Sequence, residues 1–393
     1  MAHRLHRNRV RAVVATSALL GGGLAGLVLA SPAGAATSAL SPHGGVLTVL
    51  GNSGDNTISV SRDANGAILV NGRHVRIHGV TATVANVKLL RVLSGAGNDT
   101  VALDETVGAL PQAALFGGTG NDRITGSSAA DRLHGGPGDD VLLGGSGNEL
   151  LFAGRGNDFV DGNQGADTAF LGAGDDVFQW DPGDGSDVVE GQDGTDRMQF
   201  NGANIAERFE VSANGPRIRF TRDIGSITMD LDGVETVDVP ALGGADTLTV
   251  DDVTGTDLTE VNGDLAASGG AGDGAADNVI VNGTAGDDVI DIAGDASRVS
   301  ASGTAAQVNI AGAESANDRL TVQALAGDDV VEATGLTAAA IRLTEDGGEG
   351  DDILLGGAGG DVLLGGAGDD VLLGGPGLDT LDGGPGNNVL LQD

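Results

Sequence analysis

A repeat nine residues long dominates this sequence and restricts its fold more than any other feature. From residue 117 to 179 the chain divides into seven consecutive nines, GGTGNDRIT, GSSAADRLH, GGPGDDVLL, GGSGNELLF, AGRGNDFVD, GNQGADTAF and LGAGDDVFQ. Residues 347–391 divide into five more, GGEGDDILL, GGAGGDVLL, GGAGDDVLL, GGPGLDTLD and GGPGNNVLL. The shared pattern is G-G-x-G-x-D-x-U-x, where U is a large apolar residue. Because the apolar position keeps its phase, a regular repeat structure is favoured over the alternative, a flexible low-complexity linker.

Each unit has the composition of a turn followed by a short strand. Glycine accepts positive φ and close backbone approach, which suits the first six residues. The last three residues suit a strand whose middle side chain points inward. Two nines complete one coil, so turns on the same edge should recur every eighteen residues. The predicted fold class is all-β, with parallel β-roll or β-solenoid blocks flanking a β-rich, weakly repetitive middle.

The sixth residue of nearly every unit is an aspartate. Stacked turns bring these carboxylates to about 5 Å from one another, where they repel unless a cation lies between them. Six to eight oxygen ligands from carboxylates and carbonyls favour Ca²⁺ over Mg²⁺. Binding of this kind is coupled to folding, because the unfolded chain has no site. The candidate metal ligands are Asp122, Asp140, Asp158 and Asp176 on one edge, Asp131 and Asp167 on the other, Asp352 and Asp370 on one edge of the second run, Asp361 and Asp379 on its other edge, and Asp99 in an isolated unit.

On these residues, the two runs resemble the hemolysin-type (RTX) calcium-binding repeat. The resemblance covers roughly a quarter to a third of the chain. It implies that the turn aspartates and turn carbonyls bind Ca²⁺ and that the chain folds as a β-roll. The sequence departs from the pattern at Glu149 and Asn388, which stand at the aspartate position, and at Ala153 and Leu171, which replace the first glycine.

The composition suits a narrow, acidic solenoid. The net charge is −36, aromatic residues make up 2% of the chain, and cysteine is absent. A solenoid core can be filled by small aliphatic side chains, and metal can take the stabilising role that disulfides have elsewhere. The acidity disfavours nucleic acid as a partner.

The N-terminus has the features of a secretory signal peptide. Arg4, Arg7, Arg9 and Arg11 precede an apolar stretch over residues 13–30, and A-G-A follows at residues 33–35. A membrane anchor is the alternative. We expect a secreted, extracellular protein without a membrane span once the signal is removed.

The pattern predicts five segments along the chain. They are a signal peptide (1–36), an N-terminal β segment with one repeat unit (44–103), an RTX-like β-roll (117–200), β-rich middle modules (201–345) and a C-terminal RTX-like β-roll (346–393).

A longer, weaker repeat of roughly 45 residues occurs in the N-terminal segment and twice in the middle. In its first copy, Asn71-Gly72 predicts a two-residue hairpin turn. Several aspartates of the middle precede apolar strands without paired glycines, and they are interpreted as turn residues, with calcium ligation as the alternative. They are Asp246, Asp288, Asp318 and Asp329.

No catalytic motif stands out: H-E-x-x-H, G-x-S-x-G and cysteine are all absent. We therefore predict that the protein is not an enzyme but a secreted calcium-binding repeat protein that folds on Ca²⁺ binding, with a structural or adhesive role. The alternative is a polysaccharide-modifying or hydrolytic enzyme with its site in the middle β region, where a groove grouping Arg with Asp would favour it.

Several repeat strands are apolar at all three positions, for example VLL at 141–143 and 371–373. Their outward residues predict self-association or a cell-surface partner. The alternative is that these residues only favour the strand conformation.

Overall fold

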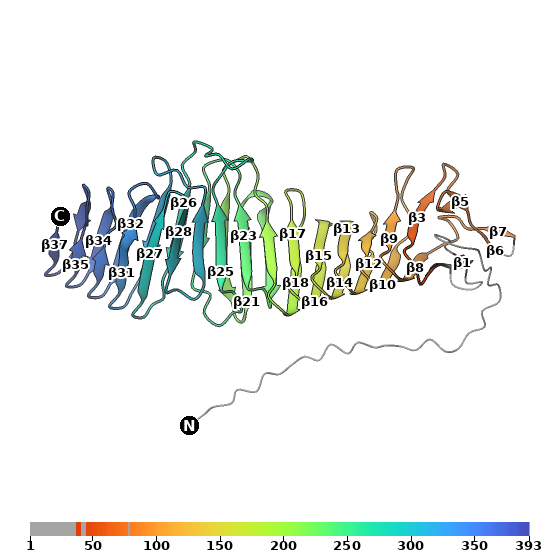
Figure 1. Ribbon diagram of the computed structural model, residues 1–393, viewed down its shortest axis with the longest axis horizontal. Helices are drawn as coiled ribbons and strands as arrows, with labels where there is room; N and C mark the ends of the chain where they lie inside the picture. The colour runs from red at the N-terminus through yellow and green to blue at the C-terminus, as the bar shows by residue number, and fades with distance from the viewer. Residues whose placement is uncertain (1–36, 41–44, 78, 393) are drawn as a thin grey trace, which may run out of the picture.

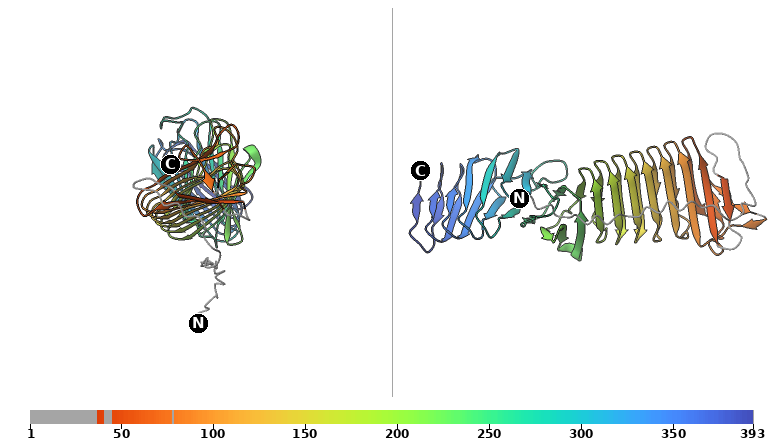
Figure 2. Two further views of the ribbon diagram at one scale, coloured as in Figure 1. Left: turned by 90° about the vertical axis from the view of Figure 1, so that its right-hand side faces the viewer. Right: turned by 90° about the horizontal axis from the view of Figure 1, so that it is seen from below.

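The computed structural model describes residues 37–40, 45–77 and 79–392. Its body is an elongated solenoid in which two long sheets, A and B, face each other (Figure 1). Seen along its length, the coils lie one behind another (Figure 2). The predicted signal peptide at residues 1–36 lies outside the described residues. No helix in the described part of the chain has the length and apolarity needed to cross a membrane.

The chain passes from one sheet to the other and back in each coil. Sheet A contains β1 (Thr37–Leu40), β2 (Val46–Asn52), β8 (Leu89–Ala96), β10 (Ala113–Thr119), β12 (Arg132–Pro137), β14 (Leu150–Arg155), β16 (Thr168–Ala173), β18 (Val188–Asp193), β20 (Arg208–Asn214), β21 (Arg217–Arg222), β22 (Ile227–Asp232), β24 (Thr247–Val250), β26 (Asn278–Asn282), β30 (Arg319–Gln323), β32 (Arg342–Glu349), β34 (Val362–Ala367) and β36 (Thr380–Asp382).

Sheet B contains β3 (Thr57–Arg62), β4 (Ile68–Val70), β5 (Arg73–His74), β9 (Thr100–Leu103), β11 (Arg123–Thr125), β13 (Val141–Gly147), β15 (Phe159–Gly165), β17 (Val177–Trp180), β19 (Arg197–Phe200), β23 (Thr236–Pro240), β25 (Glu260–Asp264), β27 (Val289–Asp295), β28 (Arg298–Ser302), β29 (Gln307–Ala311), β31 (Val330–Leu336), β33 (Ile353–Leu355), β35 (Val371–Leu373) and β37 (Val389–Leu391). The small hairpin β6 (Arg76–Ile77) and β7 (Val80–Thr81) and the 3₁₀ turn η1 (Ile224–Ser226) complete the described elements.

The register between stacked strands confirms the eighteen-residue coil. In sheet A, Leu133 pairs in parallel with Leu151, and in sheet B, Leu142 pairs with Val160. The middle residue of the repeat strands points into the coil, as predicted, and it is buried in all but the last coil, where Leu381 is half-buried and Leu390 is exposed. In the first run these residues have no exposed surface: Ile124, Leu133, Leu142, Leu151, Val160, Ala169 and Phe178.

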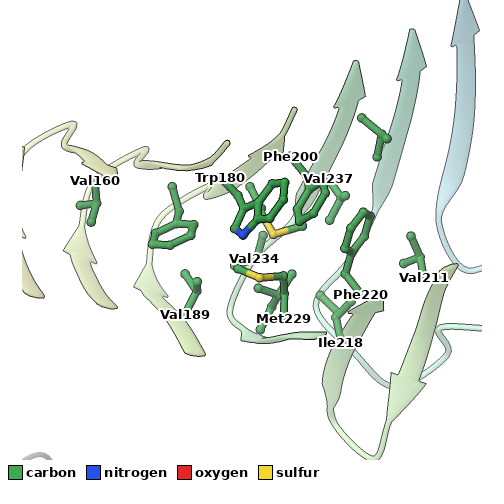
Figure 3. Packing of buried hydrophobic residues seen from close by; sticks show 14 of the residues in the cluster. Val160, Trp180, Val189, Phe200, Val211, Ile218, Phe220, Met229, Val234 and Val237 are labelled. Carbon is green, nitrogen blue, oxygen red and sulfur yellow. The ribbon is translucent and has the colours of Figure 1, made fainter. Parts of the chain in front are cut away.

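The core becomes wider and more aromatic beyond residue 179. Trp180 stacks on Phe200 with their ring centroids 3.9 Å apart, and Phe220 packs 4.5 Å from Phe200 (Figure 3). Aromatic packing of this kind adds to the burial of apolar area. Trp180, Phe200, Phe209 and Phe220, which are all buried, thus fill the core of this part of the solenoid.

Three antiparallel meanders correspond to the weak 45-residue repeat. They are β3–β4–β5, β20–β21–β22 and β27–β28–β29. In the second, β18 pairs in parallel with β22 and β20 with β24, so the meander is inserted into sheet A without interrupting it. The predicted turn at Asn71-Gly72 joins β4 to β5, and both residues have positive φ, 49° and 73°.

Sheet hydrogen bonds cross the segment boundaries expected from sequence. The pairing of β18 with β22 spans residue 200, and the pairings of β31 with β33 and of β32 with β34 span residue 345. The repeat runs and the middle therefore share both sheets, and the positions of domain boundaries remain predictions.

Candidate metal centre on the two edges

The turns that precede the strands of sheet B form one long edge, here called edge 1. Along it, each ladder aspartate donates its backbone N–H to Oδ1 of the aspartate one coil further on. From Asp99 through Asp122, Asp140, Asp158 and Asp176 to Asp196, these N···O distances lie between 2.7 and 2.9 Å. The same contact links Asp329, Asp352, Asp370 and Asn388 in the second run, at 2.8 to 3.0 Å. The predicted placement of Asp122, Asp140, Asp158 and Asp176 on one edge, eighteen residues apart, is confirmed.

The turns that precede the strands of sheet A form the opposite edge, edge 2. The N–H of Ala113 donates to Asp131 Oδ1 at 2.6 Å, and the N–H of Glu149 donates to Asp167 Oδ1 at 2.7 Å. In the second run, Asp361 donates to Asp379 Oδ1 at 3.0 Å. The predicted ligands therefore fall into two ladders on opposite edges, each held in place by main-chain hydrogen bonds.

In most of these ladder carboxylates, the second oxygen is buried without a hydrogen-bond partner among the described residues. A buried polar atom of this kind is costly, and the cost is greater for a charged group. The oxygens concerned are Oδ2 of Asp99, Asp122, Asp140, Asp158, Asp167, Asp176, Asp196, Asp329, Asp352, Asp361 and Asp370, and both Oε atoms of Glu149. A cation between the turns would satisfy them.

The RTX calcium-binding nonapeptide repeat matches this chain in four copies, at residues 116–148, 143–178, 346–363 and 355–390. The two runs are RTX calcium-binding repeats. Repeats of this type bind calcium, and the orphaned ladder oxygens fit that ligand. No curated protein matches the chain.

The glycines of the RTX turns are required by the close stacking of the coils. Gly136 has φ +126°, and a Cβ there would overlap the carbonyl oxygen of Gly118 in the preceding coil. A Cβ at Gly135, the first glycine of its unit, would overlap the Asp140 carboxylate. Ala153 and Leu171, which replace the first glycine of their units, have side chains fully buried in the coil. Carboxylates and turn carbonyls are thus brought together between successive turns.

Burial sets the protonation of the RTX carboxylates. It raises the pKa of Asp140 and of Asp158 to about 7 and that of Asp122 to about 6, because desolvation disfavours the charged form. Burial, together with the Asp167 charge, raises the pKa of Glu149 to about 9. A nearby cation would reverse this effect by stabilising the carboxylates.

The predicted ligands are not equivalent. Asp131 Oδ2 accepts hydrogen bonds from the N–H and the hydroxyl of Ser127, at 2.8 and 2.7 Å. Asp379 Oδ2 accepts a hydrogen bond from the Gln392 side-chain amide at 2.6 Å. The Asn388 side-chain amide donates a hydrogen bond to the Gly383 carbonyl at 2.6 Å. These three positions have less remaining capacity for a metal than the ladder from Asp122 to Asp176.

The ladder also continues outside the matched repeats. On edge 2, Asp246 donates its N–H to Asp277 Oδ1 at 2.7 Å, and Asp277 donates to Asp318 at 3.0 Å. Asp277 was not identified from sequence, although it directly precedes the apolar strand β26, which was the available signal. Within the described residues, no three His, Cys, Asp or Glu side chains converge on one point.

Proposed function

We propose that this is a secreted calcium-binding repeat protein that folds when Ca²⁺ binds to its RTX turns and that serves a structural or adhesive role. The observation that supports this most strongly is the row of buried carboxylate oxygens without partners along edge 1. Bound Ca²⁺ supplies the positive charge that these stacked carboxylates lack. Asp122, Asp140, Asp158 and Asp176 hold the ladder in register and present one oxygen each.

Secretion is supported by the basic, apolar and A-x-A regions of residues 1–36. With a charge of −36, the calcium-free chain is expanded by self-repulsion, which is compatible with export before folding. Folding then occurs where calcium is plentiful.

A structural or adhesive role is supported by a row of rings on the outer face of sheet A. Phe116, His134, Phe152 and Phe170 stack face to face, with successive ring centroids 4.6, 4.6 and 5.1 Å apart. The row repeats with the coil and is half-buried. A rigid, regular face of this kind suits contact with a repetitive surface or a second copy.

The calcium role is tested by comparing Asp158→Asn with Asp131→Asn. Asparagine keeps the Oδ1 acceptor of the ladder and removes the charge. We expect D158N to raise the calcium concentration at the folding midpoint about tenfold, roughly 1.4 kcal/mol, because Asp158 Oδ2 has no other partner. D131N should shift it much less, since Ser127 already satisfies Asp131. Equal shifts for the two variants, measured by calcium titration of the β signal, would contradict this assignment.

A second candidate function is polysaccharide modification, because the middle does contain a hollow that groups arginine with acids. It has a volume of about 450 Å³ on the outer face of sheet B, away from the ladder edges. Arg197 pairs with Asp238 at 3.1 Å, and Arg298 pairs with Glu260 at 3.6 Å. Release of reducing ends from acidic polysaccharides by the intact chain, abolished in Arg197→Ala, would establish the enzyme. We expect no release, since each arginine is already paired with a carboxylate.

A further inference from the structure

Glu345 is a buried acid that does not belong to either ladder. It lies on β32, where alternate residues point into the coil, and it has no exposed surface. Its neighbours in register are Val322 on β30 and Leu363 on β34, both fully buried core residues. A carboxylate therefore occupies the place of an aliphatic side chain in the middle of the core.

Neither oxygen of Glu345 has a hydrogen-bond partner among the described residues. The acid whose charge acts on Glu345 is Asp361, the first RTX aspartate of edge 2 in the second run. Burial, and after it the charge of Asp361, raises the pKa of Glu345 well above its ordinary value. Asp361 is itself 3% exposed, and its Oδ2 also lacks a partner.

The register explains why the two acids meet. Glu345 pairs with Leu363, so Asp361, the last residue of the turn before β34, stands two residues before the position opposite Glu345. Glu345 and Asp361 are both buried, 0% and 3% exposed, so both carboxyl groups lie inside the coil.

We propose that Glu345 and Asp361 together hold a calcium ion at the junction between the middle of the solenoid and the C-terminal RTX run. A proton shared between Glu345 and Asp361 Oδ2 does not serve as well, because it would leave the second oxygen of Glu345 without a partner. A hard cation uses the oxygens of both acids at once. This site rests on the proposed function, because it assumes that the neighbouring RTX turns bind calcium.

The site has a structural consequence. Leu320 and Val322 of β30 pair with Leu343 and Glu345 of β32, whereas β34 continues only the second of these two core columns, with Leu363, so the coil narrows at this point. A cation bound to β32 and to the turn before β34 would fix this change of width. Folding of the C-terminal run would then depend on the middle.

The test is to count the calcium ions bound to the full chain by native mass spectrometry. Glu345→Gln removes the charge but mimics a protonated acid, and Glu332→Gln is the matched control, because Glu332 lies on the strand β31 outside the RTX turns with an exposed side chain. We expect E345Q to bind one ion fewer than the wild type and E332Q to bind the same number. An unchanged count in E345Q would overturn the proposal.

A second variant is needed in case E345Q does not fold. Glu345→Leu matches the aliphatic neighbours in its column, and replacing a buried charge by an apolar residue is often tolerated. It should also bind one ion fewer while keeping its β signal in calcium, and a full count would overturn the proposal. A wild type that bound no calcium at all would contradict the proposed function itself. A wild type that binds calcium, with the same number of ions in E345Q, would contradict only the Glu345 site.

Discussion

Acidifying the calcium-free protein from about pH 8 to about pH 5 is expected to increase its β-structure. Burial raises the pKa of Asp140, Asp158 and Asp196 to about 7, whereas the unfolded value is 3.8. Between these values the folded chain binds more protons than the unfolded chain, so its stability rises as the pH falls. Protons would thus partly replace calcium on the ladders.

The measurement is far-UV circular dichroism of metal-free protein across this range, which stays above the sequence pI of about 4.1. The control is the same series in saturating calcium, where protons compete with the metal and the gain should disappear. A calcium-free chain that loses β signal on acidification would show that the ladder carboxylates are not buried as described.

Replacing a stacked turn glycine is expected to be the most damaging single substitution. Gly136→Ala places a Cβ against the Gly118 carbonyl at a φ of +126°. Backbone strain and overpacking each cost about 1–3 kcal/mol, so we expect a loss of about 3 kcal/mol or more in the free energy of unfolding in calcium. Urea denaturation in saturating calcium measures it.

Gly183 is the matched control, since its φ is +122° but a Cβ there would meet nothing within 4 Å. Gly183→Ala should lose only the strain contribution, about 1–3 kcal/mol. If the two alanine variants were equally stable, close stacking of the coils would not be what selects glycine in these turns.

The repeat runs could be predicted closely because their local and long-range signals coincide. The glycines define the turn, the aspartate stands directly before the strand, and the period of nine assigns Asp122 and Asp140 to one edge and Asp131 to the other. The main-chain contacts along both edges follow this assignment.

The middle could be predicted only in part. Alternating apolar residues identify β20, β21 and β22 as strands, but alternation says nothing about pairing order, and here β18 pairs with β22 rather than with β20. The residue type gives even less information about the burial of Glu345, because an acid between Thr344 and Asp346 resembles part of an exposed polar stretch. Its burial follows from the register of β32 against β34, which only the assembled sheet defines.

The central claim, that calcium binding drives folding, is tested most directly by far-UV circular dichroism of the chain titrated with Ca²⁺, then with Mg²⁺ in a separate series, and finally with a chelator. We expect the β signal to rise with Ca²⁺, to respond little to Mg²⁺ and to return to its starting value with the chelator, because the ladders need a cation with many oxygen ligands. A spectrum that is already fully β at neutral pH without calcium, and that does not change on its addition, would contradict the claim.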